Sequence, residues 1–144
     1  MAVVSSEHTI LVIEDNAADA DLVIDALSGV PSAPVLIVAS GGREALEMLR
    51  DPANGSLPAV VLLDLNLPGF SGLQTLAELK GDPALRRVPV VVLTTSKSQN
   101  EVDRCYELGA AAVLNKPLRL REYREMLRAF ERFWLGHVRL PERT

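Results

Sequence analysis

The segment AVVLLDLNLP, residues 59–68, decides the fold of this chain. Its first five residues are apolar and run without a break into the carboxylate of Asp64. The run is too short for a buried helix and lacks the alternation of a half-exposed strand, so it predicts a strand covered on both faces. Pro68 and Gly69 then turn the chain. Asp64 therefore stands at a strand end, where it either caps a turn or belongs to a binding site, because ligands bind at the carboxyl ends of parallel strands.

The composition is that of one globular domain. A length of 144 residues, of which 48% are hydrophobic, argues against a disordered or fibrous chain. The net charge of −4 provides no general basic surface for nucleic acid. The single cysteine, Cys105, excludes an internal disulfide and indicates a buried thiol in a reducing compartment. Neither a signal peptide nor a membrane-length apolar run is evident, so we expect a cytoplasmic protein with no nucleic-acid or membrane partner.

Apolar patterning predicts five strands that alternate with five helices. Continuous apolar runs place the other strands at 9–13, 35–38, 88–93 and 111–114. Apolar residues spaced three and four apart place helices at 17–27, 41–50, 71–80, 98–108 and from 119 onward. In these helices we expect Ile24 and Ala77 to face the core. The alternation predicts one doubly wound α/β domain, a parallel sheet with helices on both faces, over a core of about 8–136 with a short tail at 137–144 and no output domain.

The strand ends bring chemically reactive residues together. Because the carboxyl ends of parallel strands lie at one edge, five residues that are far apart in the sequence converge there: Glu14, Asp15, Asp64, Thr94 and Lys116. Three crowded carboxylates repel one another unless a cation compensates them, and oxygen ligands with room for water and phosphate suit Mg²⁺. An ionised Asp64 is then a candidate nucleophile, and Lys116 and Thr94 can neutralise and hydrogen-bond phosphoryl oxygens.

On these residues the chain resembles the receiver domains of two-component response regulators. The matching motifs are Glu14-Asp15, Asp64 with Asn66 and Pro68, Thr94, and Lys116-Pro117. They cover essentially the whole chain in the family's order. The resemblance implies the flavodoxin-like strand order 2-1-3-4-5. It also implies a protein that catalyses its own phosphorylation and dephosphorylation, with a sensor histidine kinase as donor.

The resemblance assigns a role to each site residue. Asp64 is the phosphoacceptor, and the Mg²⁺ ligands are Asp15, Asp64 and the main-chain carbonyl of Asn66. Glu14 acts mostly through a metal-bound water. Lys116 pairs with the phosphoryl group, and the hydroxyl of Thr94 is drawn towards it, so that the face formed by helix 98–108, strand 111–114 and the last helix rearranges.

The chain departs from the family pattern beside the switch threonine. The family's aromatic partner of that threonine is replaced by Val113, so a rotating ring at this position cannot report activation, and packing or association must do so. Thr95 is bulkier than the alanine or glycine frequent there and narrows access to Asp64. Asn66 and Ser96 occupy positions that tune the lifetime of the acyl phosphate.

The last helix carries more apolar residues than one core face needs. It is either a well-covered core helix or, as we prefer, one side of a homodimer. The residues expected at that dimer interface are Tyr123, Leu127, Phe130, Phe133 and Trp134. Four arginines also recur along the helix, but interleaved glutamates favour a solvated face over an acidic or nucleic-acid partner.

The tail narrows the resemblance. Phe133-Trp134-Leu135 followed by Leu140-Pro141 resembles the single-domain regulators of bacterial phytochrome histidine kinases, which implies a kinase of that type as donor and an unknown downstream protein. The chief alternative is a receiver fold that takes no phosphate and acts by docking. A flavin binder is disfavoured by the acidic loop after the first strand, and an aspartate phosphatase by Asn66, which stands where a second acid is needed.

Overall fold

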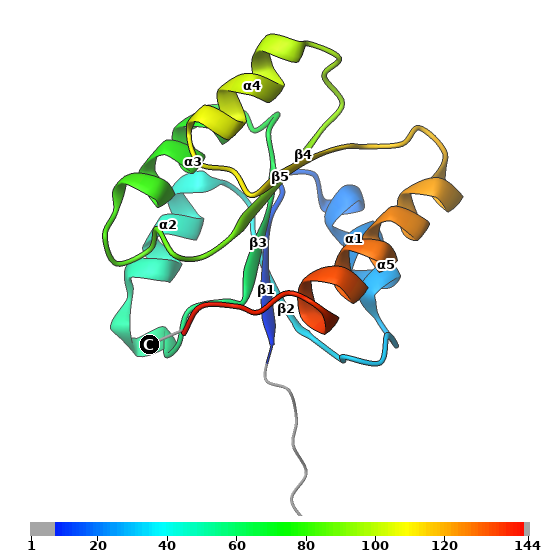
Figure 1. Ribbon diagram of the computed structural model, residues 1–144, viewed down its shortest axis with the longest axis horizontal. Coiled ribbons are helices and arrows are strands. Elements are labelled where there is room, and N and C mark those ends of the chain that lie inside the picture. The colour runs from blue at the N-terminus through cyan, green and yellow to red at the C-terminus, as the bar shows by residue number, and fades with distance from the viewer. Residues whose placement is uncertain (1–7, 143–144) are drawn as a thin grey trace, which may run out of the picture.

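The computed structural model describes residues 8–142 and contains one five-stranded parallel sheet. The strand order is β2-β1-β3-β4-β5, as the resemblance implied, and Figure 1 views this sheet on edge. The strands are β1 (Thr9–Ile13), β2 (Val35–Ala39), β3 (Val60–Asp64), β4 (Val90–Thr94) and β5 (Ala112–Asn115). The register places Asp64 beside Leu93 and Thr94 beside Asn115, so the polar strand ends are level with one another.

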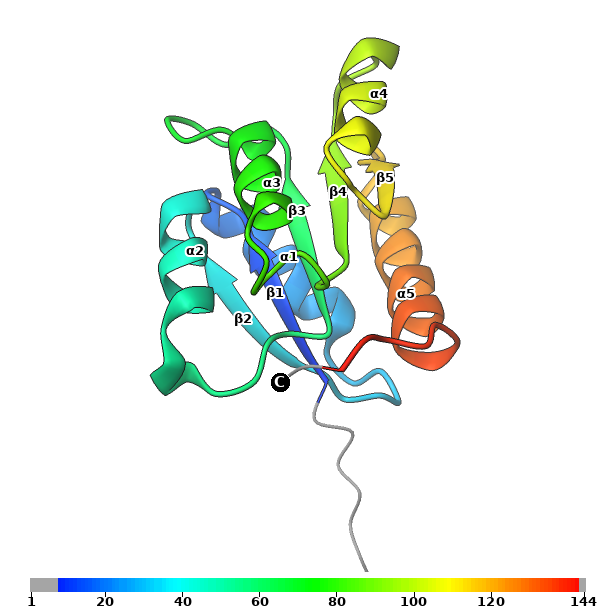
Figure 2. The ribbon, with the colours of Figure 1, turned by 60° about the vertical axis from the view of Figure 1, so that its left-hand side comes forward.

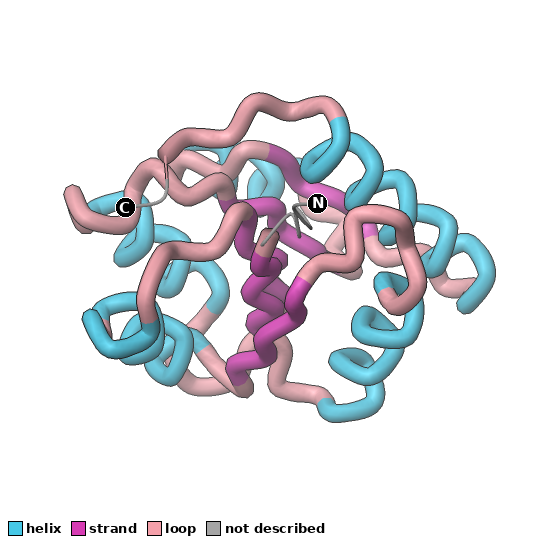
Figure 3. The backbone as a smooth tube through the Cα atoms, turned by 90° about the horizontal axis from the view of Figure 1, so that it is seen from below, coloured by secondary structure: helices cyan, strands magenta, loops and turns pink. Residues whose placement is uncertain are grey.

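Helices cover both faces of the sheet. The helices are α1 (Ala17–Leu27), α2 (Gly42–Arg50), α3 (Gly72–Gly81), α4 (Gln99–Glu107) and α5 (Leu120–Gly136), with a short 3₁₀ helix at Pro52–Asn54. Helices α1 and α5 lie on one face and α2, α3 and α4 on the other, with the strands between them in Figure 3. The tail after α5 returns beneath the sheet, where Pro141 lines a pocket with Leu57, Pro58 and Val88.

Strand β3 is the centre of the core, and all five of its residues are buried. Val61 and Leu63 pack towards α2 and α3, whereas Val60 and Leu62 pack towards α1 and α5. A strand covered in this way reads as a continuous apolar run because neither face meets water. The prediction from the segment 59–68 is therefore confirmed.

Side-chain caps fix the helices that follow the polar strand ends. Asn16 accepts a hydrogen bond from the amide of Asp19 at 3.0 Å and begins α1. Ser71 and Gln74 form a capping box at the start of α3, and Ser98 caps α4. Since these caps lie a few residues after Asp15, Asp64 and Thr94, they limit the freedom of the loops that carry the site.

The prediction that Ile24 and Ala77 face the core is wrong. Ile24 is 36% exposed, because α1 turns Ala20, Val23 and Ala26 towards the sheet instead. Ala77 is exposed in α3, where Thr75 is buried. Burial of the Thr75 hydroxyl is tolerated because it donates to the carbonyl of Ser71 at 2.8 Å.

Three of the residues expected at a dimer interface belong to the protein's own core. Tyr123, Leu127 and Phe130 are buried on the α5 side of the sheet and pack in the cluster of α1, β1 and β3 side chains. They are unavailable to a second copy, so that part of the prediction is wrong. Of the same set, Phe133 is 56% exposed and Trp134 is partly buried, with the two rings edge to face at a centroid distance of 6.0 Å.

Candidate functional site

The polar residues predicted to converge lie at one edge of the sheet. Glu14 directly follows β1, and its amide donates to the carbonyl of Ala39 at 3.0 Å. Lys116 directly follows β5, and its amide donates to the carbonyl of Thr94 at 2.8 Å. These main-chain bonds extend the ladder by one residue, so the side chains that leave the strand ends are held by the sheet itself.

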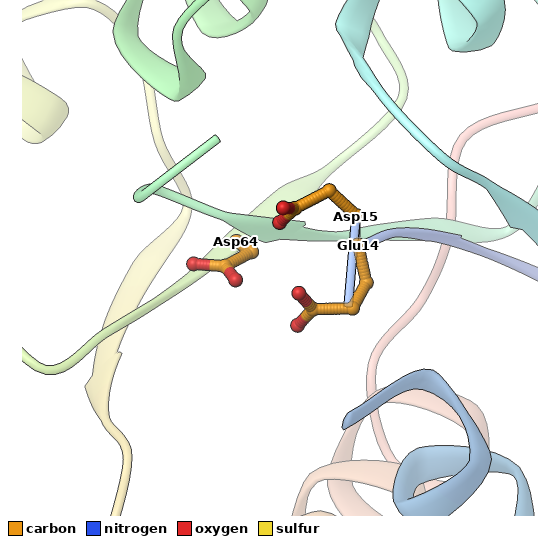
Figure 4. Close-up of side chains that lie close together, drawn as sticks. All are labelled: Glu14, Asp15 and Asp64. Atoms are coloured by element: carbon orange, nitrogen blue, oxygen red, sulfur yellow. The ribbon is translucent and has the colours of Figure 1, made fainter. Parts of the chain in front are cut away.

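Three carboxylates form the acidic part of the site. One oxygen from each of Glu14, Asp15 and Asp64 lies within 4.8 Å of the others, and Figure 4 shows the three side chains close together. Glu14 is 4% and Asp64 5% exposed, whereas Asp15 is open to solvent. Hard cations prefer oxygen ligands, and the exposed side of Asp15 leaves room for water or a further oxygen ligand. The donor set therefore fits a divalent cation of the Mg²⁺ type.

Lys116 places a positive charge against this cluster. Its Nζ donates to Asp64 Oδ2 at 3.0 Å and to Glu14 Oε1 at 3.4 Å. Burial by itself lowers the pKa of Lys116, but the hydrogen bond to Asp64 and the charges of both carboxylates outweigh it and raise that pKa. The ammonium is therefore charged, and it neutralises part of the negative charge of Glu14 and Asp64, the two carboxylates that are almost closed to water.

Glu14 is the carboxyl group most perturbed by this crowding. Burial first, then the hydrogen bond with Asp64 and the charge of that carboxylate, raises its pKa from 4.5 to about 7. The charge of Lys116 offsets part of this increase. In the absence of a cation, Glu14 therefore holds a proton over much of the range below neutrality.

The loops after β3 and β4 are tied to Asp64 and to each other. The amide of Asn66 donates to Asp64 Oδ1 at 2.9 Å, which folds the chain tightly around the carboxylate. The side-chain amide of Asn66 donates to Thr95 Oγ1 at 3.2 Å. These contacts link Asp64 to the loop after β4 through Asn66, one of the two positions named from the sequence as tuning the acyl phosphate, whereas Ser96, the other, takes no part in them.

Thr94 is fully buried, and its hydroxyl oxygen is held by a main-chain hydrogen bond. Its Oγ1 accepts a hydrogen bond from the amide of Ser96 at 2.9 Å. The carbonyl of Ser96 in turn accepts from the side chain of Asn115 at 3.0 Å. Sequence patterning provided no reason to select Asn115, since an asparagine before Lys116 is typical of an ordinary turn. Only the tertiary structure, which places the end of β5 beside the loop after β4, reveals this contact.

Comparison with known proteins decides the family. The sequence model of the response regulator receiver domain matches residues 10–128. This chain belongs to the response regulator receiver family. The receiver domain is 40% identical over 135 residues to response regulator Rcp1 of Synechocystis sp. strain PCC 6803, a match that covers 92% of each protein.

Solved structures agree with this assignment. The phosphorylated cyanobacterial phytochrome response regulator RcpA superposes with a TM-score of 0.89 at 37% identity, over 94% of this chain and 99% of that one. The Mn²⁺-bound form of Rcp1 superposes with a TM-score of 0.87 at 39% identity, again over 94% and 99%. The receiver domain is thus related to phytochrome response regulators. Among residues 8–142, no helix has both the length and the apolar composition that a membrane crossing requires.

Proposed function

We propose that this receiver domain takes a phosphoryl group from a sensor histidine kinase onto the carboxylate of Asp64. The observation that carries the proposal is the 3.0 Å contact between Lys116 Nζ and Asp64 Oδ2 inside a cluster of three acids. One Asp64 oxygen attacks the phosphorus of a phosphohistidine, the phosphorus–nitrogen bond breaks, and the imidazole nitrogen takes up a proton. The kinship with RcpA and Rcp1 supports a phytochrome-type kinase as donor.

The metal in this proposal is Mg²⁺. Asp15, Asp64 and the main-chain carbonyl of Asn66 would hold it, with Glu14 acting through a bound water. The cation supplies positive charge next to the transferred phosphoryl oxygens, as in other phosphoryl transfers. Support comes from the carboxylate cluster, whose donors are all oxygen atoms. Further support comes from the relative Rcp1, whose solved structure holds the divalent ion Mn²⁺.

The remaining site residues bind and shield the phosphoryl group. Lys116 exchanges its contact with the Asp64 carboxylate for one with a phosphoryl oxygen, and Thr94 donates its hydroxyl to another. The bonded pair Asn66 and Thr95 limits the approach of water to the acyl phosphate. Together with Ser96, this pair would set how long the modification lasts.

The proposal is tested by phosphotransfer followed by mass spectrometry of the intact protein. The receiver domain is incubated with Mg²⁺ and acetyl phosphate, or with an autophosphorylated phytochrome-type kinase. We expect a gain of one phosphoryl mass in both cases, and its loss after treatment with hydroxylamine, which cleaves acyl phosphates. A protein that stays unmodified with every donor would instead be a receiver fold that acts by docking.

The raised pKa of Glu14 makes metal binding depend on pH. A cation favours the ionised carboxylate, so Mg²⁺ must displace a proton wherever Glu14 is protonated, below a pH of about 7. We expect the affinity for Mg²⁺ to fall about tenfold for each pH unit below that value and to level off above it. Calorimetric titrations in buffers of different ionisation enthalpy measure the released proton. In Glu14→Gln the proton release should disappear, and a flat profile in the unchanged protein would contradict the assignment.

We also propose that the receiver domain forms a homodimer through the surface of α4, β5 and α5. Tyr106, Leu120 and Phe133 are large exposed side chains on these helices, and exposed apolar side chains mark association sites where they form one patch. We expect Phe133→Ala to weaken the dimer at least about tenfold, because aromatic side chains dominate the energetics of interfaces.

Light scattering at high micromolar concentration measures this association, with and without acetyl phosphate. Ile24→Ala is the matched control, since Ile24 is an exposed apolar residue on α1 and lies outside the proposed surface. If the protein without substitutions is monomeric both with and without acetyl phosphate, the dimer is refuted. An equal effect of the two substitutions would refute its location.

A further inference from the structure

Strand β5 lies at an open edge of the sheet. It pairs with β4 on one side only, and an edge strand leaves main-chain amides without a partner in the ladder. One of these amides is bonded to a side chain instead. The amide of Val113 donates to the hydroxyl of Tyr106 at 3.1 Å. Tyr106 belongs to α4, so a single hydrogen bond joins this helix to the outer edge of β5.

Helix α4 has few other attachments to the domain. Of its nine residues, all described, only Cys105 is buried. Figure 2 shows the helix beside β4 and β5 at one end of the sheet. A helix with so little buried apolar surface belongs to the less stable part of a fold, so one hydrogen bond is a larger share of what holds it in place. The ring of Tyr106 is 49% exposed, so the bond is formed at the surface.

The loop that leads into α4 is bonded at its other end to the site. Ser96 donates its amide to the hydroxyl oxygen of Thr94, and its carbonyl accepts from Asn115, the last residue of β5. A phosphoryl oxygen on Asp64 is a strong acceptor for the Thr94 hydroxyl. Rotation of that hydroxyl towards Asp64 withdraws its oxygen from Ser96, and the start of α4 loses one of its two fixed points.

We propose that the bond between Tyr106 and Val113 is a latch that holds α4 on β5 while Asp64 is unmodified and opens when Asp64 carries a phosphoryl group. Opening frees the phenol of Tyr106 and uncovers one amide of the β5 edge, both on the surface proposed for association. The latch rests on the proposed function, because the modification of Asp64 is its trigger. It assigns to a residue of α4 the signal that Val113, which has no ring, cannot give.

Removal of the hydroxyl should release the latch without modification. Tyr106→Phe keeps the ring and deletes the bond, which destabilises the unmodified arrangement alone and shifts the population towards the open one. We expect acetyl phosphate to label Tyr106→Phe about two to ten times faster than the unchanged protein, the range that corresponds to one net hydrogen bond. Gln99→Ala is the matched control, since it deletes a bond to Asp103 within α4 that does not reach β5. Equal labelling rates of the two variants would overturn the latch.

The two tyrosines of the chain allow the latch to be observed directly. Incorporation of 3-fluorotyrosine gives one fluorine resonance for each, and Tyr106→Phe assigns them. Tyr123 reports occupancy of the site, because Lys116, Glu14 and Asp64 act electrostatically on its buried hydroxyl. Tyr106 reports the latch. With excess acetyl phosphate and Mg²⁺, we expect both resonances to move while the intact mass gains one phosphoryl group.

The other outcomes separate the latch from the proposed function. If the mass increases and Tyr123 moves while Tyr106 does not, the site is modified and the latch is wrong. If the mass stays constant and neither resonance moves, phosphorylation of Asp64 is wrong and the latch, which depends on it, falls as well.

Discussion

Replacement of Asp64 by asparagine is expected to abolish phosphoryl labelling by acetyl phosphate and Mg²⁺. An amide oxygen is a poor nucleophile and carries no charge, so the variant lacks both the attacking group and one proposed metal ligand. The side chain keeps its size, and its one amide oxygen can still accept from one of the two donors, Lys116 or the amide of Asn66, which contact different carboxylate oxygens at 3.0 and 2.9 Å. The loss should therefore be one of chemistry, with the fold retained.

A second aspartate provides the control for this experiment. Asp82 follows α3, bonds to Arg50 at 3.1 Å and caps the turn at Ala84, and asparagine can keep that cap. Asp82→Asn should be labelled like the unchanged protein. Intact mass measures labelling, and thermal unfolding checks the fold. If Asp64→Asn is labelled at the normal rate, the phosphoacceptor is another residue, and peptide mapping would identify it.

Gly72→Ala is expected to lower the free energy of unfolding by about 3 kcal/mol, because the methyl group of the alanine has no space at this position. A Cβ at this position would lie 2.5 Å from the carbonyl oxygen and 2.6 Å from the Cα of Leu65. Both atoms are main chain, so no side-chain rotation can relieve the contact. Leu65 directly follows Asp64, and the start of α3 must retreat from the site to make room. Labelling of Asp64 should therefore slow down along with the loss of stability.

Gly81→Ala is the matched control at the other end of the same helix. No atom lies within 4 Å of the position that its Cβ would take. Alanine is the better helix former, so the free energy of unfolding should stay the same or rise by up to about 1 kcal/mol. Denaturation by guanidinium chloride measures both variants. If Gly72→Ala loses no more than Gly81→Ala, α3 does not depend on its close approach to Leu65.

The packing of helices was the less predictable part of the fold. Strand positions followed from apolar runs, because a strand buried on both faces needs an apolar residue at every position. A helix needs only a stripe, and the width and direction of the stripe depend on its neighbours. Ile24 and Ala77 fit the helical spacing and yet lie outside the contact, while Ala26 and Thr75 lie within it.

The last helix shows the same dependence on its neighbours. The sequence indicated correctly that α5 has more apolar residues than one face requires. It did not indicate which of them the domain uses for itself. The structure buries Tyr123, Leu127 and Phe130 beneath α1 and the sheet and leaves Phe133 exposed. A count of apolar residues is local information, whereas the division between core and surface is decided by what packs against the helix.

The sequence alone determined which polar residues stand at the strand ends and that they converge, because a parallel sheet aligns the carboxyl ends of all its strands. The strand order was implied by the resemblance to receiver domains and not by the alternation of strands and helices. Tertiary structure alone decided the contacts that give those residues their properties. The bonds of Lys116 to Asp64 and Glu14, the raised pKa of Glu14 and the bond of Tyr106 to Val113 all depend on distances of about 3 Å across separate loops. Hydrogen bonds and desolvation act only at such short range, and no spacing along the chain specifies it.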